Sequence, residues 1–269
     1  MAPKQASSMA KKRSCQTDWL TTSCKVRTRL MATLWSTDAM RARVQAILDF
    51  ALELAGVVRE RILGWTRGSG IPVLTKIRRP GFAHGPSGVA FAISRLADTC
   101  SVGGFEACID ALLAGEDEAF EAGAGNWQDV HAPDPTAIGR QASYRASWCN
   151  GAPGIALARA SLRTPKSSVM AAALETTAAC KTGGDSICCG EAGRAAILLR
   201  LGKQLGDAGW LEAGLGKVHN LAVRERYTFF KDDEGSVFSP GLFSGLAGIG
   251  YTLLQHATKG ALPEIITFS

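Results

Sequence analysis

The sequence lacks several features that would place it in a specialised class of protein. No apolar stretch reaches the roughly 18 to 20 residues of a membrane-spanning helix, so no membrane span is expected. The N-terminus has no apolar core and no A-x-A-type cleavage site, which argues against a secretory signal. Alternating runs of β-branched and aromatic residues are scarce, which disfavours a β-sheet protein. We therefore expect a helical, cytoplasmic protein.

Acidic residues are scarce at the N-terminus. Residues 1–45 hold nine Lys and Arg against Asp18 and Asp38, a net charge of +7, so the rest of the chain carries −1 of the total of +6. Because the basicity is confined to this segment, a nucleic-acid-binding face on the main body has little support. Residues 1–40 are predicted to be a disordered tail; a wrongly assigned start or an organelle transit peptide would share its composition. The main domain is expected over residues 41–269.

Cysteine is the residue type with the most to explain. The chain has eight, at positions 15, 24, 100, 108, 149, 180, 188 and 189. A long chain without an export signal can build its own core, so reduced thiols or a metal site are favoured over a disulfide framework. Cys100, Cys108 and Cys180 fall on amphipathic stretches and are expected in the core.

One pattern recurs four times along the chain. It consists of a polar residue, a Gly-x-x-Gly motif and two to three turns with apolar residues at helical spacing. The copies are HGPSGVAFAISRLA (84–97), NGAPGIALARASL (150–162), CGEAGRAAILLRLG (189–202) and SGLAGIGYTLLQHA (244–257). A single Gly-x-x-Gly would mean little, but four in the same phase indicate an internal repeat.

Helices alternate between two types in this repeat. The segments after the glycines are rich in small and apolar residues nearly all round, as helices buried on every side should be. Amphipathic helices are predicted between them, over residues 39–63, 105–122, 168–181 and 207–226. This order predicts an all-α fold, an α/α toroid with a double layer of helices; the alternative is an irregular helical bundle. The glycines are expected to allow positive φ and close approach of backbones.

The repeat also predicts where chemistry gathers. If all inner helices point the same way, the residues just before each Gly-x-x-Gly meet at one rim. The equivalent positions there are His84, Asn150, Cys189 and Ser244. One residue earlier, Cys149 is equivalent to Cys188.

Cys149, Cys188 and Cys189 would then form a Zn²⁺ site, because zinc prefers thiolate and imidazole ligands in a tetrahedron. Three protein ligands leave one position open for water or for a substrate thiol, whose proton the metal would displace. The alternative is that the three cysteines are buried small residues or form a disulfide. His84 is a candidate general acid or base. Arg145 is a candidate for neutralising an anionic species beside the metal.

Five stretches of the sequence resemble a known family. The stretches are GFAHGPSG (81–88), SWCNGAPGIALAR (147–159), ICCGEAGR (187–194), SPGLFSGLAGIGYTLL (239–254) and LPEII (262–266). In this order they are similar to the LanC-like lanthionine cyclases, above all to the C-terminal cyclase domain of the bifunctional class II lanthipeptide synthetases. The resemblance runs from about residue 41 to the C-terminus. It implies an α/α toroid with one Zn²⁺ that adds peptide Cys thiols to dehydroalanine or dehydrobutyrine.

The resemblance also implies roles for particular residues. The zinc ligands fall on Cys149, Cys188 and Cys189, where the third position is usually His and some class II members have Cys. The catalytic His falls on His84 and the active-site Arg on Arg145. The implied partners are a dehydrated precursor peptide and a dehydratase or the missing part of the cyclase.

The chain also departs from the family pattern. The family toroid has seven inner-helix repeats and this chain shows four, so an incomplete, N-terminally truncated toroid is expected. An active-site Asp of an earlier repeat has no match in residues 1–83, and the dehydratase domain is absent from the sequence. A non-catalytic fragment or split subunit that needs a partner chain is therefore the alternative to a cyclase. An unrelated toroid enzyme such as a glycosidase would need paired carboxylates at the rim.

Overall fold

A computed structural model describes the chain over residues 37–67, 79–100, 103–129, 144–162, 169–181, 183–229, 231–232, 235–236 and 238–268. Residues 1–57 and 58–269 form separate compact units. Residues 1–36 of the predicted tail, with Cys15 and Cys24, lie outside the described residues. The described residues form eight α-helices and four two-residue strands. The all-α prediction is confirmed.

The first described helix is α2, Thr37–Arg67, where the sequence predicts a helix over 39–63. It is rich in Ala, Leu, Glu and Arg, which favour helix, and Asp38 lies in its first turn, where a negative charge is favourable. Its exposed apolar side chains recur every three or four residues at Met40, Val44, Ile47, Phe50, Leu54 and Val57. None of the described helices is long and apolar enough to cross a membrane.

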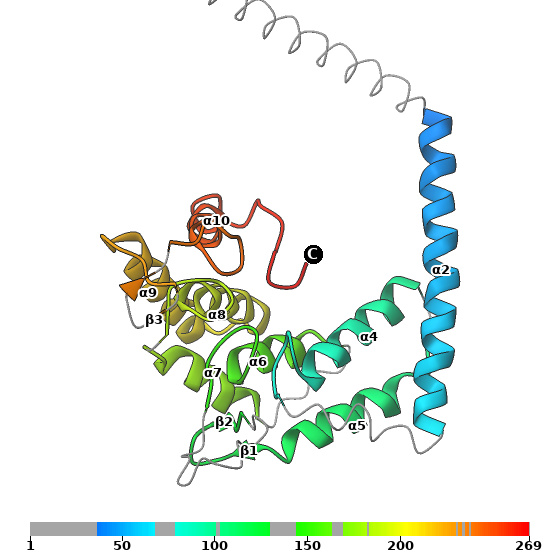
Figure 1. The fold of residues 1–269 in the computed structure, drawn as a ribbon, viewed down its shortest axis with the longest axis horizontal. Coiled ribbons are helices and arrows are strands. Elements are labelled where there is room, and N and C mark those ends of the chain that lie inside the picture. Colours follow the sequence, from blue (N-terminus) through cyan, green and yellow to red (C-terminus); the bar gives the residue numbers. More distant parts are fainter. Residues whose placement is uncertain are drawn as a thin grey trace, which may run out of the picture. The chain divides into compact units, whose positions relative to one another are not determined.

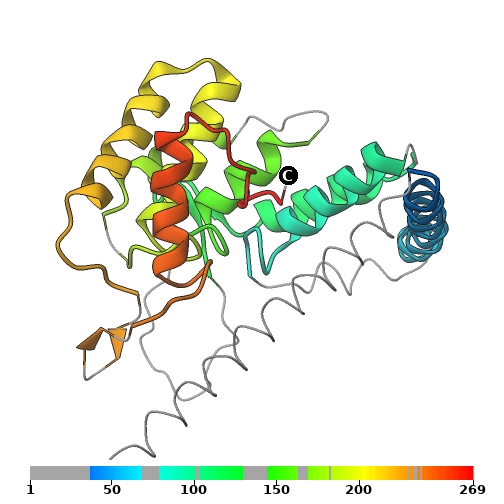
Figure 2. The same ribbon diagram turned by 90° about the horizontal axis from the view of Figure 1, so that it is seen from above.

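Four inner helices follow the four Gly-x-x-Gly motifs. They are α4 (Pro86–Cys100), α6 (Ala152–Ala160), α8 (Glu191–Leu205) and α10 (Leu246–Ala257). Each begins at the residue directly after the first glycine of its motif, and each packs against the next one along the chain (Figures 1 and 2). Every residue of α6 is buried, as the predicted position inside a double layer requires.

Three outer helices complete the double layer. They are α5 (Glu106–Asp117), α7 (Met170–Ala179) and α9 (Ala208–Ala222), each packed on the inner helix that precedes it (Figure 1). All three lie inside the predicted amphipathic segments. Cys108 is buried on α5 as expected, but Cys180 is only half-buried because it follows the last turn of α7.

Two short antiparallel pairs are the only strands among the described residues. They are β1 (Phe120–Glu121) with β2 (Asn126–Trp127), and β3 (Lys231–Asp232) with β4 (Gly235–Ser236). Trp127 is fully buried and contributes to the main core together with α6, α7 and α8. A second core cluster lies between α4 and α5 around Phe105 and Leu112.

The paired glycines are explained by close backbone contact. A Cβ on the second glycine of each motif would lie less than 3.0 Å from the carbonyl oxygen of the residue six positions earlier. This holds for Gly88, Gly154, Gly193 and Gly248. The loop before each helix therefore folds back onto the first turn of that helix, so only glycine fits. The expectation of positive φ is correct at Gly151, with φ of 87°, and wrong at the other seven glycines of the motifs.

Candidate metal centre

A chain of backbone hydrogen bonds joins the four motifs at one rim of the inner layer. The N–H of Ala83 donates to the carbonyl of Cys149 at 3.1 Å, and the N–H of Cys149 donates to the carbonyl of Cys188 at 3.3 Å. The N–H of Cys188 donates to the carbonyl of Phe243 at 2.8 Å. All four residues stand two positions before the first glycine of their motif. The predicted convergence of equivalent positions at one rim is therefore present in the structure.

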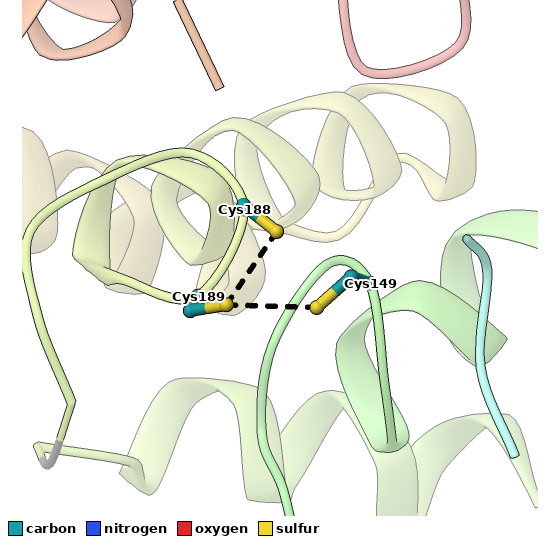
Figure 3. A group of neighbouring side chains, drawn as sticks. All are labelled: Cys149, Cys188 and Cys189. Atoms are coloured by element: carbon teal, nitrogen blue, oxygen red, sulfur yellow. Dashed lines mark hydrogen bonds between the residues drawn. The ribbon is translucent and has the colours of Figure 1, made fainter. Parts of the chain in front are cut away.

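Three thiols meet at this rim (Figure 3). Cys149 lies in the loop before α6, and Cys188 and Cys189 lie in the turn before α8. The sulfur atoms of Cys149 and Cys189 are 3.6 Å apart, and those of Cys189 and Cys188 are 3.4 Å apart. All three sulfur atoms lie within 4.8 Å of one another. Cys149, Cys188 and Cys189 are free thiols, so the alternative of a disulfide between them is not realised.

The pKa values of the three thiols are shifted in different directions. Hydrogen bonds from Cys188 and then Cys189 lower the pKa of Cys149 from 9.0 to about 2, against the opposing effect of burial. The pKa of Cys188 and the pKa of Cys189 are both raised, above all because of their hydrogen bonds with Cys149. The cluster therefore favours one thiolate held by two thiols, since further ionisation would place like charges side by side.

This arrangement fits a tetrahedral thiolate-binding metal ion. Zinc–sulfur bonds of about 2.3 Å in a tetrahedron place neighbouring sulfur atoms about 3.8 Å apart. The sulfur separations of 3.4 and 3.6 Å are close to that value. A divalent cation would also offset the repulsion that opposes ionisation of the second and third thiols. Cys149, Cys188 and Cys189 are thus suited to hold Zn²⁺ and would leave its fourth position open.

Small hydroxyl groups fix the two cysteine segments. The Ser147 hydroxyl lies 3.4 Å from the sulfur of Cys149 and donates to the carbonyl of Asn150 at 2.8 Å. The N–H of Cys189 donates to the Ser186 hydroxyl at 3.4 Å. Each turn is thus closed by a serine two or three residues before its cysteine.

A buried ion-paired arginine connects the two cysteine segments. Arg194 on α8 donates from Nη1 to the carbonyl of Ala146 at 3.0 Å, and from Nη2 to Glu191 at 2.9 Å. Lys217 on α9 pairs with the same carboxylate at 3.3 Å. Sequence reasoning did not single out these three charged residues. The sequence does indicate that Glu191 and Arg194 need partners. Both lie in a helix predicted to be buried all round, where an unpaired charge is costly.

His84 and Arg145 lie near the thiols, and both are exposed in part. His84 follows Ala83, which bonds to Cys149, and its charge contributes to the low pKa of Cys149 after the hydrogen bonds of the two other thiols. The charge of Arg145 opposes the raised pKa of Cys189, so it also reaches the cluster. Its Nε donates to the buried Asp129 at 2.9 Å, while 53% of its side chain stays exposed. Both catalytic roles remain predictions.

A comparison with known families now adds to the geometry. A family model described as "Lanthionine synthetase C-like protein" matches residues 37–267. The chain belongs to this lanthionine synthetase C-like family. The matched region begins with α2 and includes all four motifs, so the rim with its three thiols lies inside the lanthionine synthetase C-like domain. A search of curated proteins found no match for the chain.

Proposed function

We propose that this protein is a zinc-dependent lanthionine cyclase of lanthipeptide biosynthesis. The reaction adds the thiol of a peptide cysteine across the C=C bond of a dehydroalanine or dehydrobutyrine in the same peptide. The thiol loses its proton, the sulfur forms a bond to the β carbon, and the α carbon takes up a proton. The observation that carries the proposal is the cluster of Cys149, Cys188 and Cys189 at the rim of a lanthionine synthetase C-like domain.

In the proposed site, the three cysteines hold Zn²⁺. When bound, zinc supplies a Lewis acid that keeps the substrate thiol ionised near neutral pH. The backbone bond between Cys149 and Cys188 and the Arg194 contact to Ala146 fix both cysteine segments without the metal. Such support keeps a first ligand shell in place and raises its affinity for the ion.

The proton steps fall to His84 in this proposal. Its side chain is exposed and its charge acts on Cys149, so it stands where a peptide bound at the rim would present its reacting atoms. A histidine exchanges protons at neutral pH, which suits delivery of a proton to the α carbon. Arg145 would attract the negative charge that develops on the carbonyl oxygen next to that carbon. Its ion pair with Asp129 holds it in place for this role.

We further place the protein with the class II lanthipeptide synthetases. The support is the third sulfur, since Cys189 occupies the position where the family usually has His. Its partners are then a dehydrated precursor peptide and the dehydratase that prepares it. The reaction takes place in the cytoplasm, where such precursors are made.

The test is a cyclisation assay. A peptide with one cysteine and one dehydroalanine is incubated with the zinc-loaded protein, and free thiols are counted by alkylation and mass spectrometry. The proposal predicts thiol loss that a chelator stops and that Cys149→Ala abolishes, with Cys180→Ala as the control that retains it. Thiol loss at the uncatalysed rate, in a folded protein with bound zinc, would contradict independent catalysis.

A second candidate is a split subunit that is active only with another polypeptide. Exposed apolar side chains around α10 favour it, because such groups in one region are often covered by a partner. They are Phe238, Leu242, Leu246 and Leu254. The assay separates the two candidates, since a split subunit binds zinc but turns over only when its partner is added.

A glycosidase has no comparable support. Its two catalytic carboxyl groups would have to face a common substrate at the rim. Asp129 and Glu191, the acidic groups bound to the cysteine segments, are instead each paired with an arginine.

A further inference from the structure

A pocket lies at the C-terminal end of α8, the opposite end from the cysteines. It has a volume of about 750 Å³ and is lined by the second half of α8, by α9, by the end of α10 and by residues 260–264. Arg200 on its wall is eleven residues beyond Cys189, which corresponds to about 16 Å along a helix. None of the proposed metal ligands, nor His84 or Arg145, lines it. The pocket is therefore separate from the proposed catalytic centre.

Positive charge exceeds negative charge on the wall of this pocket. Arg200, Lys203 and Lys259 face a single carboxylate, that of Glu264. Elsewhere in the described part of the protein, the buried cations each have a carboxylate partner: Arg159 pairs with Glu116 and Asp117, and Arg194 and Lys217 share Glu191. No described residue forms an ion pair with Lys203 or Lys259.

Arg200 provides the most specific evidence. Its Nη1 pairs with Glu264, but its Nε is buried and has no hydrogen-bond partner among the described residues. Burial, and then the nearby charge of Arg95, lower the pKa of Arg200. The Arg200 side chain is 27% exposed and has Glu264 as its ion-pair partner, so the accessible part of the guanidinium can still donate to an added anion.

Lys203 alone would carry no such argument. It stands in the last turn of α8, where a cation is also favourable for the helix dipole. Lys259 lies beyond the end of α10 and Arg200 lies one turn before the end of α8, so neither is explained in this way. The excess charge at the pocket therefore rests on Arg200 and Lys259.

The remaining lining is polar at Gln204, Thr252, Gln255 and His256. The rest of it is apolar. Leu199, Leu211, Leu215 and Leu262 form it. The volume is within the range of about 300 to 1,000 Å³ that is typical of small-molecule sites. From these observations we propose that the pocket binds a small organic anion with a carboxylate head and an apolar body. The carboxylate contacts Arg200 and Lys259, and the apolar body lies against the leucines.

The experiment uses octanoate as the probe and 1-octanol as its neutral counterpart, titrated into the zinc-loaded full-length protein by isothermal calorimetry. We expect saturable, one-site binding of octanoate, and binding of octanol at least 10-fold weaker. Arg200→Met and Lys259→Met should each weaken octanoate binding about 10-fold, whereas Lys181→Met, an exposed lysine outside the pocket, should not.

Several outcomes would overturn the proposal. These are no saturable octanoate binding, equal binding of octanoate and octanol, or binding unchanged in both pocket variants. Lys259 is exposed, so its variant tests the proposal even if Arg200→Met fails to fold. Zinc content and cyclisation do not enter the readout, so the result is independent of the proposed function.

Discussion

The N–H of Cys149 donates to the main-chain carbonyl of Cys188 at 3.3 Å. This bond joins equivalent positions of two neighbouring repeats, 39 residues apart in the sequence. It sets the two cysteine segments side by side through the backbone alone. The packing of the repeats therefore brings the three thiols of the proposed metal site together, and side-chain contacts such as that of Arg194 add to it.

The first prediction concerns metal content. The double variant Cys188→Ala, Cys189→Ala should lose its zinc, because one remaining thiolate cannot hold the ion against buffer and water. Wild type should carry one zinc per chain in elemental analysis after purification under reducing conditions. Cys180→Ala, which removes a thiol outside the cluster, should keep the wild-type stoichiometry. An unchanged zinc content in the double variant would contradict zinc binding at these cysteines.

The second prediction concerns pH and the metal-free protein. The pKa of Cys188 and the pKa of Cys189 are raised in the folded state, so both keep their protons at a pH where the unfolded chain loses them. The free energy of unfolding should therefore fall as pH rises above the ordinary thiol value of 9.0. Urea unfolding in the presence of a chelator, from pH 9 to pH 10, measures this change, because below pH 9 the lowered pKa of Cys149 acts in the opposite direction. The Cys188→Ala, Cys189→Ala variant should show a smaller fall, and equal slopes in both proteins would contradict the shared-proton cluster.

The third prediction compares two glycines of one helix. A Cβ at Gly248 would meet the carbonyl of Leu242, whereas a Cβ at Gly250 would meet nothing within 4 Å. Gly248→Ala should destabilise the protein by more than about 2 kcal/mol, because backbone cannot move aside cheaply. Gly250→Ala should be neutral or stabilising by up to about 1 kcal/mol, since alanine favours helix. Thermal unfolding of both variants checks the difference, and similar melting temperatures would contradict the close approach.

The fourth prediction concerns the arginine that connects the cysteine segments. Arg194→Met removes the contact to Ala146 and leaves Glu191 with Lys217 as its remaining partner. We expect zinc affinity to fall about 10- to 100-fold, as for other groups that support a ligand shell. A competition titration with a chromophoric chelator measures the affinity. Arg224→Met, which breaks the more exposed pair with Asp185, serves as the control and should leave zinc affinity unchanged.

The fifth prediction separates catalysis from metal binding. His84→Ala should reduce the cyclisation rate by about 10²- to 10⁴-fold, the usual contribution of a general acid or base, with zinc content unchanged. His219→Ala removes an exposed histidine of α9 and should leave the rate as in wild type. A His84→Ala protein with the wild-type rate would assign the proton transfer to another group.

Much of the fold could be predicted from the sequence because its signals are local. The spacing of apolar residues predicted α2, α5, α7 and α9, and the Gly-x-x-Gly phase predicted where the inner helices begin. That phase also brought Cys149 next to Cys188 and Cys189, since equivalent positions of stacked repeats meet. The sequence and its repeat were therefore enough to identify the three cysteines as candidate metal ligands.

The tertiary structure alone decided how charges are distributed. Arg159 meets Glu116, 43 residues away, and both are buried, yet nothing in the sequence indicates that these two residues are partners. Arg194 and Lys217 converge on one carboxylate from two helices, while Arg200 lines a pocket and pairs with Glu264. A charged side chain in a helical pattern carries no local sign of its partner, because pairing depends on which helices pack together. For that reason the cluster of three cysteines could be predicted from the repeat, but the ion pairs beside it and the pocket at the far end of α8 could not.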